Sequence, residues 1–273
     1  MDARGYAATK MGMMSEMVSK LAGKVIVVAG AGGIGAGIAG HLADEGATIV
    51  VGDVRLDAAA EVVEGIVGRG GTAVATMLDG ADEASAKEAI ALAVSRFGGL
   101  DGIHINFAFL ENARPSGMTT DVLGQNLDDF DEAMRVNARG YLLCTRQAIP
   151  ALLERGGGAI VYTATNSIYN GAADLLGYAM SKAPILPLMR HVATRYGPEG
   201  IRSNAISPGL IAHPRLETVL SDAELTGYAN AAPIKRLGRP KNIGAVSALL
   251  MSDDGDFITG QVIAVDGGGF MRP

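Results

Sequence analysis

Short apolar runs alternate with longer alanine-rich segments along most of the chain. The first run, Val25-Ile26-Val27-Val28, is apolar at every position, as a strand buried on both faces requires. Further runs of this kind predict strands over residues 47–51, 72–76, 102–106, 159–163, 202–206 and 261–265. Between most of them the pattern predicts helices over residues 33–45, 56–68, 82–97, 130–154 and 178–197. Strands that alternate with helices build a parallel sheet covered on both faces, so we predict one doubly wound α/β domain.

Two segments stand apart from this alternation. Residues 1–20 form an N-terminal extension to the predicted domain over residues 21–273, and apolar spacing predicts either a short docked helix or a frayed tail there. Residues 212–235 carry amphipathic spacing through Leu216, Val219, Leu220 and Tyr228, which predicts a helical lid. Within the last long predicted helix, Pro184 removes an amide and should bend it.

Composition narrows the class of protein. Of 273 residues 48% are hydrophobic, ample for a buried core, and the net charge of −6 argues against a nucleic-acid partner. The single cysteine, Cys144, excludes an internal disulfide and fits a reducing compartment. No apolar run approaches membrane-spanning length, and the first twenty residues lack the apolar core of a signal peptide. We therefore expect a soluble cytoplasmic protein with no membrane partner, and we predict no metal site.

A glycine-rich turn, Gly30-Ala31-Gly32-Gly33-Ile34-Gly35, follows the first strand and opens the first helix. Glycine permits a tight turn and close approach of backbone to phosphate, and the helix N-terminus supplies amide donors. Eighteen residues beyond Gly35, Asp53 ends the second strand, where its carboxylate can accept both hydroxyls of an adenosine ribose. Strand, turn, helix, strand and acid in this order predict a dinucleotide site, and helix capping is the alternative role for Asp53.

The residues around Asp53 favour NAD over NADP. The carboxylate would repel a 2′-phosphate, and the next residue, Val54, is not basic, which leaves Arg55 as the nearby cation that could favour the phosphorylated cofactor. At the end of the third strand, Asp79 and Gly80 could meet the adenine edge. Capping of the following helix is an equally good explanation for Asp79.

Tyr178 and Lys182 lie four residues apart and would share one face of a predicted helix. A phenol with a pKa of about 10 is a poor base near neutrality, but a nearby ammonium stabilises the phenolate and lowers that pKa. Such a pair can act as general acid and base on an alcohol. The same spacing occurs by chance on many solvated helices, so its meaning depends on the motifs around it.

With these motifs the chain resembles the short-chain dehydrogenase/reductase family over nearly all of residues 22–270. The further matching pieces, in the family's order, are Asn106-Phe107-Ala108-Phe109, Val136-Asn137, Pro208-Gly209-Leu210-Ile211 and Ile258-Thr259-Gly260-Gln261 leading to Val265-Asp266-Gly267-Gly268. The resemblance implies a Rossmann fold with seven parallel strands in the order 3-2-1-4-5-6-7. It also implies NAD(P) across the carboxyl edge of the sheet and a homo-oligomer, commonly a tetramer.

The resemblance also implies roles for single residues. Tyr178 would be the acid/base, Lys182 would hold the nicotinamide ribose and lower the tyrosine pKa, and Asn137 would anchor a water that relays protons. Thr165 takes the place of a serine that hydrogen-bonds the substrate oxygen, and Ser167 is its rival. Contacts to the cofactor are implied for Asn106, Ala108, Pro208, Gly209, Ile211 and His213. His213 replaces a threonine of the family and could reach substrate or pyrophosphate, but a solvated loop histidine is the interpretation we prefer.

Two departures from the family pattern affect the cofactor site. Gly30 and Gly33 enclose two residues where the family has three, and Phe109 puts a ring where the family has glycine. The substrate pocket should be built from residues 166–174, the segment after Phe109 and residues 212–235, with apolar walls from Ile168, Tyr169, Leu175 and Leu176.

These features predict an NAD-dependent alcohol dehydrogenase or ketone reductase for a substrate of moderate size and low charge. Enoyl reduction would place the tyrosine where Leu175 stands and is disfavoured. A dinucleotide-binding sensor or scaffold with little catalysis is the alternative from another class of protein.

Overall fold

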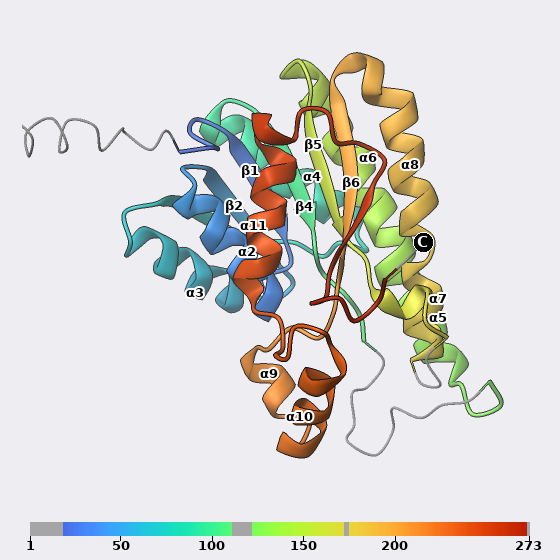
Figure 1. Ribbon diagram of the computed structural model, residues 1–273. Helices are drawn as coiled ribbons and strands as arrows, with labels where there is room; N and C mark the ends of the chain where they lie inside the picture. Colours follow the sequence, from blue (N-terminus) through green and yellow to red (C-terminus); the bar gives the residue numbers. More distant parts are fainter. Residues whose placement is uncertain (1–18, 111–121, 172–174, 272–273) are drawn as a thin grey trace, which may run out of the picture.

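The computed structural model describes residues 19–110, 122–171 and 175–271. These residues form a seven-stranded parallel sheet in the order β3-β2-β1-β4-β5-β6-β7, with helices on both faces (Figure 1). The strands are β1 (Val25–Ala29), β2 (Thr48–Asp53), β3 (Thr72–Met77), β4 (Gly102–Ile105), β5 (Gly158–Thr163), β6 (Ile201–Pro208) and β7 (Val262–Val265). The predicted fold class and strand order are confirmed.

Two hydrophobic clusters, one on each face, hold the helices to the sheet. Helices α2 (Gly33–Asp44), α3 (Leu56–Val67) and α11 (Pro240–Met251) contribute to one cluster, and α4 (Glu83–Phe97), α6 (Gly140–Glu154) and α8 (Ile185–Tyr196) to the other. Successive residues of a strand point to opposite faces. Val27 accordingly packs with α4, α6 and α8, and Val28 packs with α2, α3 and α11. This double burial explains why the central strands are apolar at every position.

The long predicted helices are interrupted in two places. The helix expected over residues 130–154 consists of α5 (Leu127–Ala133), a π-helical segment η1 (Met134–Arg139) and α6. The helix expected over 178–197 is interrupted at Ala183 and Pro184, which separate α7 (Leu176–Lys182) from α8, while the bend expected there stays a prediction. Helix α11 was not among the predicted helices, although Pro240 occupies its first turn, where proline is favoured.

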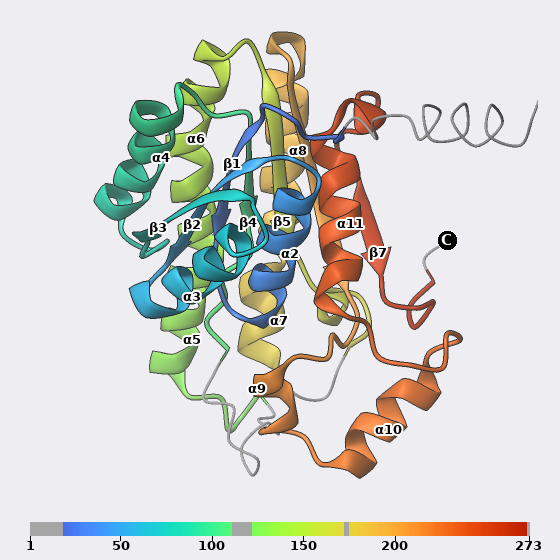
Figure 2. The ribbon, with the colours of Figure 1, turned by 90° about the vertical axis from the view of Figure 1, so that its left-hand side faces the viewer.

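Two short helices, α9 (Pro214–Glu217) and α10 (Asp222–Ala231), project beyond the carboxyl edge of the sheet in the predicted lid segment (Figure 2). Ser221 and Glu224 form a capping box that begins α10, and Tyr228 on that helix is 53% exposed. Their role as a lid stays a prediction. A helix or a tail was predicted for residues 1–20, and residues 1–18 lie outside the described part. Leu21, just after that segment, is fully buried in the cluster that α2 contributes to.

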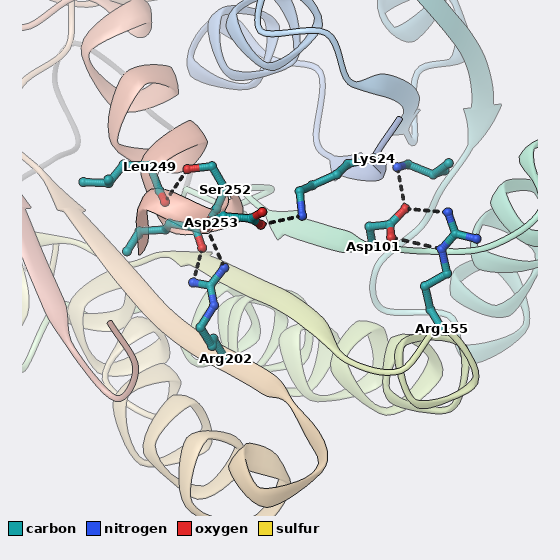
Figure 3. Close-up of polar contacts among 9 residues, drawn as sticks. Lys24, Asp101, Arg155, Arg202, Leu249, Ser252 and Asp253 are labelled. Atoms are coloured by element: carbon teal, nitrogen blue, oxygen red, sulfur yellow. Dashed lines mark hydrogen bonds and ion pairs between the residues drawn. The ribbon is translucent and has the colours of Figure 1, made fainter. Parts of the chain in front are cut away.

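Polar contacts close the opposite, amino-terminal edge of the sheet (Figure 3). Asp101 accepts hydrogen bonds from the Val25 amide at 2.8 Å and from Arg155 Nε at 3.0 Å. The Arg202 guanidinium donates to the Leu250 carbonyl and, at 3.2 Å, to the Ser252 carbonyl. These contacts join the ends of strands and helices far from the edge where the cofactor is expected.

Short helical turns η2 (Asn166–Ile168), η3 (Gly197–Glu199) and η4 (Asp253–Gly255) complete the described elements. None of the described helices is long and apolar enough to cross a lipid bilayer.

Candidate active site

The glycine turn between β1 and α2 forms one wall of a cleft of about 370 Å³ at the carboxyl edge of the sheet. A Cβ atom on Gly35 would lie 1.8 Å from the Gly30 carbonyl oxygen, and Gly30 has a φ of 106°. The shortened turn therefore closes with backbone directly against backbone, which only glycine permits. Within the described residues no side chain caps α2 and no acidic residue lies in its first turn. Its amides and positive dipole end can therefore receive a phosphate.

Asp53 lies beside this turn at the end of β2. Its Oδ2 accepts a hydrogen bond from the Ala31 amide at 2.7 Å, and its Oδ1 accepts one from the Arg55 amide at 2.9 Å. The N-cap residue of α3 is Arg55 and not Asp53. Helix capping therefore does not account for a carboxylate at position 53. Each carboxylate oxygen keeps a lone pair for a ribose hydroxyl. Both oxygens are therefore held in place at the mouth of the cleft.

Asp79 fixes the next turn along the cleft and is not a helix cap. Its Oδ1 accepts a hydrogen bond from the Ala81 amide at 2.9 Å, whereas Asp82 caps α4 by accepting from the Ala84 amide. The turn brings Gly80 against the ring of Phe107, and a Cβ on Gly80 would lie 2.1 Å from that ring. Glycine at position 80 is thus required by the ring beside it.

A chain of buried side chains supports Asn106 from behind the cleft. Thr163 Oγ1 donates to Asn106 Oδ1 at 2.9 Å, so it must accept from His104 Nε2, also at 2.9 Å. His104 Nδ1 is then left to accept from Ser247 Oγ at 2.8 Å. Burial lowers the pKa of His104 to about 3, so this neutral tautomer persists across the physiological range. Sequence reasoning missed His104, because a lone histidine in a strand carries no motif.

Helix α7 presents Tyr178 and Lys182 at the same edge of the sheet. Burial raises the pKa of Tyr178 to about 12, and hydrogen bonding to Thr165 opposes that rise. Burial lowers the pKa of Lys182 to about 7, because the charged ammonium is the form that burial disfavours. The expected lowering of the tyrosine pKa by the lysine is therefore not found in this arrangement. Its physical reason is that Lys182 Nζ donates elsewhere, to the Phe107 and Thr163 carbonyls at 3.2 and 3.3 Å.

Thr165 and Ser167 lie together where β5 ends. Their hydroxyl oxygens are 3.1 Å apart, and the Ser167 amide donates to Thr165 Oγ1 at 3.2 Å. Of the two, Thr165 is the residue whose hydroxyl acts on the Tyr178 pKa, where it opposes the rise that burial causes. Thr165 is thus the residue of this pair that is coupled to Tyr178, with Ser167 bonded to it.

Asn137 is fully buried in the π-helical segment and ties α7 to the loop after β4. Its Oδ1 accepts from the Phe109 amide at 2.7 Å, and its Nδ2 donates to the Phe109 carbonyl at 2.8 Å and to Ser181 Oγ at 2.9 Å. Ser181 Oγ in turn donates to the Tyr178 carbonyl at 2.8 Å. Because the side chain is committed to these bonds, a water held by Asn137 would bind its backbone. A π-helical segment is a common feature of functional sites.

The chain is similar to known proteins over most of its length. Residues 28–269 match the family model described as enoyl-(acyl carrier protein) reductase. A probable short-chain type dehydrogenase/reductase of Bradyrhizobium diazoefficiens is 40% identical over 92% of this chain and 89% of its own. The cyclohexanol dehydrogenase of an Acinetobacter species is 35% identical, covering 92% and 96%. The 2,5-dichloro-2,5-cyclohexadiene-1,4-diol dehydrogenase of Sphingobium indicum is 35% identical, covering 92% and 98%.

The chain belongs to the short-chain dehydrogenase/reductase family. A crystal structure of a short-chain type dehydrogenase/reductase from Mycobacterium marinum superposes with a TM-score of 0.84 at 27% identity, covering 93% of this chain and 98% of that one. The family consists of oxidoreductases that use a nicotinamide cofactor, and relatives in it act on alcohols. The protein is therefore an oxidoreductase of this family.

The structure gathers most of the expected cofactor residues along one edge. The cleft is lined by the expected residues Gly30, Gly32, Asp53, Val54, Asp79, Gly80, Asn106 and Ala108, and also by Arg55, Leu78, Phe107, Phe109, Glu132, Arg135 and Val136. The segment after β6 reaches the same place. A Cβ on Gly33 would lie 2.6 Å from the His213 side chain, so this half-buried histidine packs on the glycine turn and is not simply solvated.

The other residues of that segment are positioned by the end of β6. The Gly209 amide donates to the Val265 carbonyl at 3.1 Å. The bridge between Ile211 and Gly238 is made by the Leu210 carbonyl and the Ala212 amide. The peptide groups of Ile211 itself consequently face away from Gly238, as alternate residues do in a parallel pair. This orientation suits the expected contact of Ile211 with a carboxamide.

A C-terminal segment, which was not among those expected to build the substrate pocket, reaches the residues after β5. Asp266, just after β7, accepts hydrogen bonds from Asn166 Nδ2 at 2.7 Å and from the Phe270 amide at 2.9 Å. The Phe270 ring stacks on Tyr169 with centroids 5.7 Å apart. Residues 266–270 therefore join Tyr169 in the wall next to Thr165. Of the other segments expected there, residues 111–121 and 172–174 lie outside the described part.

Proposed function

We propose that the protein transfers hydride between NAD(H) and a secondary alcohol or ketone, with Tyr178 as acid/base. The observation that carries this proposal is the position of α7. This helix brings Tyr178 and the buried Lys182 to the carboxyl ends of β4 and β5, on the same edge as the glycine turn and Asp53. NAD supplies the hydride acceptor when bound.

The side chains divide the proton chemistry among them. In alcohol oxidation the Tyr178 phenolate accepts the hydroxyl proton, and in ketone reduction the phenol returns it. Thr165 donates a hydrogen bond to the substrate oxygen, where negative charge develops. The Lys182 ammonium, which lies on the same edge and donates to the Phe107 and Thr163 carbonyls, binds the nicotinamide ribose. The influence of Thr165 on the Tyr178 pKa supports these roles, because it acts only when the two hydroxyl groups lie close together.

The cofactor we propose is NAD rather than NADP. A 2′-phosphate would approach the Asp53 carboxylate, which is fixed by the Ala31 and Arg55 amides and cannot turn away without losing them. The Arg55 guanidinium lies 4.0 Å from this carboxylate, but its side chain is 66% exposed and contributes little against the repulsion. Titration with both cofactors should therefore show tighter binding of NADH than of NADPH. Asp53→Ala should narrow the gap, and equal affinities in the wild-type protein would contradict this choice.

The substrate we propose is a cyclic alcohol or ketone of moderate size and low charge. The wall beside Thr165 presents the stacked rings of Tyr169 and Phe270 together with Ile168. Flat rings of this kind pack well against another ring. The names of the cyclohexanol and dichlorocyclohexadiene-diol dehydrogenases point to six-membered-ring substrates in two relatives. Cyclic secondary alcohols should therefore be used in preference to linear primary ones.

Two other functions are less well supported. Enoyl reduction, the activity named by the family model, would place the tyrosine at position 175, where the chain has leucine. An NAD-binding sensor would not require Tyr178, Lys182, Thr165 and Asn137 to converge on one edge as they do.

The deciding experiment is an assay of the purified protein with NAD⁺ and a panel of cyclic and linear alcohols, followed by NADH absorbance. We expect oxidation of cyclic secondary alcohols and its loss in Tyr178→Phe, which deletes only the transferable proton and should retain NADH binding. A protein that binds NADH yet converts no alcohol or ketone would favour the sensor. Full activity in Tyr178→Phe would assign the acid/base elsewhere.

A further inference from the structure

The shortest contact of the Lys182 ammonium is with Tyr141, a residue outside every motif considered above. Lys182 is fully buried, and its Nζ donates to the Tyr141 hydroxyl at 2.6 Å. Nζ also lies 4.2 Å from the centroid of the Tyr141 ring. The two carbonyls described above are more distant, at 3.2 and 3.3 Å. Tyr141 therefore meets the charge with both its oxygen and its ring face.

The orientation of Tyr141 is fixed by its own contacts. Its hydroxyl, within 2.9 Å of the Phe107 carbonyl and 3.1 Å of the Thr163 carbonyl, donates its proton to one of them. The Phe107 ring packs edge-on against it with centroids 5.0 Å apart. With the proton directed to a carbonyl, a lone pair of the hydroxyl oxygen is left facing the ammonium. Tyr141 is thus a preorganised acceptor for Lys182.

This arrangement is an anchor and not a relay of protons. Backbone carbonyls accept hydrogen bonds but carry no proton to pass on, and Tyr141 is fully buried. Burial raises the pKa of Tyr141 well above its usual value, so the phenol stays protonated. We propose that Tyr141 is a positioning residue that holds the Lys182 ammonium at the ends of β4 and β5 and keeps it charged. The effect of Tyr141 on catalysis rests on the proposed function, in which Lys182 binds the cofactor.

Lys182 is the group in this cluster that titrates near neutrality. The other titratable side chains that face it, or lie just behind Tyr141, are Tyr178 on α7, Cys144 on α6 and Tyr162 on β5. Burial raises the pKa of each of these, so all are neutral at pH 7. The lysine pKa of about 7 reflects burial alone, which opposes the charged form. The hydroxyl and ring face of Tyr141 favour the charged form of Lys182, and so they limit how far burial lowers its pKa.

Removal of the Tyr141 hydroxyl should therefore lower the titration midpoint of Lys182. The test is NMR of protein labelled with ¹³C at the lysine ε-carbons, titrated with pH, with the Lys182 signal assigned by its absence in Lys182→Arg. Tyr141→Phe keeps the ring and should lower the midpoint by about one pH unit, the size of a hydrogen bond to a charged group. Tyr162→Phe is the matched control, because Tyr162 is equally buried and stacks on Tyr141 but bonds Thr145 instead of Lys182.

The proposal is overturned if the midpoint is unchanged in Tyr141→Phe, or if Tyr162→Phe shifts it equally. A second readout needs no variant: in the wild-type protein the Tyr141 ring should shift the Lys182 ε-methylene protons upfield, and random-coil shifts would refute the geometry. NADH affinity should also weaken at a lower pH in Tyr141→Phe than in the wild type. If the wild-type protein converted no alcohol, the proposed function would fail, while the lysine titration would still decide the role of Tyr141.

Discussion

At the scale of single residues, burial favours the uncharged forms of both Tyr178 and Lys182. It raises the pKa of the Tyr178 phenol to about 12 and lowers that of the Lys182 ammonium to about 7. The phenolate required for oxidation is thus scarce at neutral pH, whereas the phenol required for reduction is abundant. Alcohol oxidation should rise with pH as Tyr178 ionises, and ketone reduction should fall over the same range. Rate profiles measured where chemistry limits turnover will check this, and flat profiles would contradict the assignment.

Lys182 should also cost the protein stability. Its folded pKa of about 7 lies below the unfolded value near 10.5, so below pH 7 both states carry the charge and the burial penalty is complete. As pH rises from about 7 to 10.5 the unfolded state alone holds the proton, and the penalty falls by about 1.4 kcal/mol per pH unit. Lys182→Met should therefore unfold with a free energy a few kcal/mol higher at pH 7, and lose activity. Denaturation at several pH values should show the gain shrinking above pH 7; a gain that grew with pH would refute this account.

The hydroxyl that binds the substrate oxygen can be assigned by a pair of substitutions. Thr165→Val removes the hydroxyl and keeps the shape, so it should lower kcat by about a hundredfold, the effect of one oxyanion donor. Ser167→Ala should have a small effect, because Ser167 bonds Thr165, and Thr165 is the residue that acts on the Tyr178 pKa. Thr165→Ser should remain active. Steady-state rates of the three variants will decide, and an active Thr165→Val beside an inactive Ser167→Ala would give the role to Ser167.

Residues that carry a motif could be predicted from the sequence, and residues that act by tertiary contact could not. The positions of Asp53, Tyr178 and Lys182 follow from their place at strand ends and on one helix face. Tyr141 and His104 have no such signal, because their partners lie 41 and 59 residues away in the chain. Only the fold brings those partners together.

At the scale of elements, the glycine turn depends on contacts between backbone atoms. The positions differ sharply in the room they offer: a Cβ on Gly35 would overlap the Gly30 carbonyl oxygen at 1.8 Å, whereas one on Gly40, in the same helix, would meet only the end of the Arg69 side chain at 3.2 Å. We therefore expect alanine to be tolerated at position 40, in the helix, and not at position 35, in the turn.

Gly35→Ala should abolish NADH binding, because the turn must open to accept the methyl group. Gly40→Ala should leave binding intact and raise the free energy of unfolding by up to about 1 kcal/mol through helix propensity. Fluorescence titration with NADH and chemical denaturation will separate the two variants. Wild-type affinity in Gly35→Ala would show that the turn is not the cofactor site.

Element boundaries show where pattern reasoning ends. The break at Pro184 could be predicted, because proline lacks an amide donor. The π-helical segment around Asn137 could not be, since its extra residue is stabilised by bonds from Asn137 to Phe109 and Ser181. Those partners lie outside the helix, and no local spacing in the sequence reveals them.

At the scale of the whole molecule, the sheet separates chemistry from stability. Its carboxyl edge carries the cleft, α7 and the segment after β6, while its amino edge carries the contacts of Asp101 and Arg202 (Figure 3). The strand order could be predicted from the resemblance, which covers the whole domain. The approach of residues 266–270 to Asn166 could not be, because the bond from Asn166 to Asp266 spans 100 residues and the motif that contains Asp266 does not reveal this partner. Loops from distant strands meet at one edge only after the sheet has formed.

This separation predicts that substitutions at the amino edge lower the free energy of unfolding and leave the catalytic activity unchanged. Asp101→Ala removes the acceptor of the Val25 amide and of Arg155, and Val25 is only 4% exposed, so its amide is left unpaired in the interior. A buried donor without a partner costs about 1–3 kcal/mol. Lys24→Ala, which breaks the bridge to the 94% exposed Asp253 on the same edge, should cost less than about 1 kcal/mol. Both variants should retain wild-type kcat and NADH affinity at a temperature where they remain folded. Urea unfolding beside steady-state kinetics will check this, and a loss of kcat in folded Asp101→Ala would show that the two edges of the sheet are coupled.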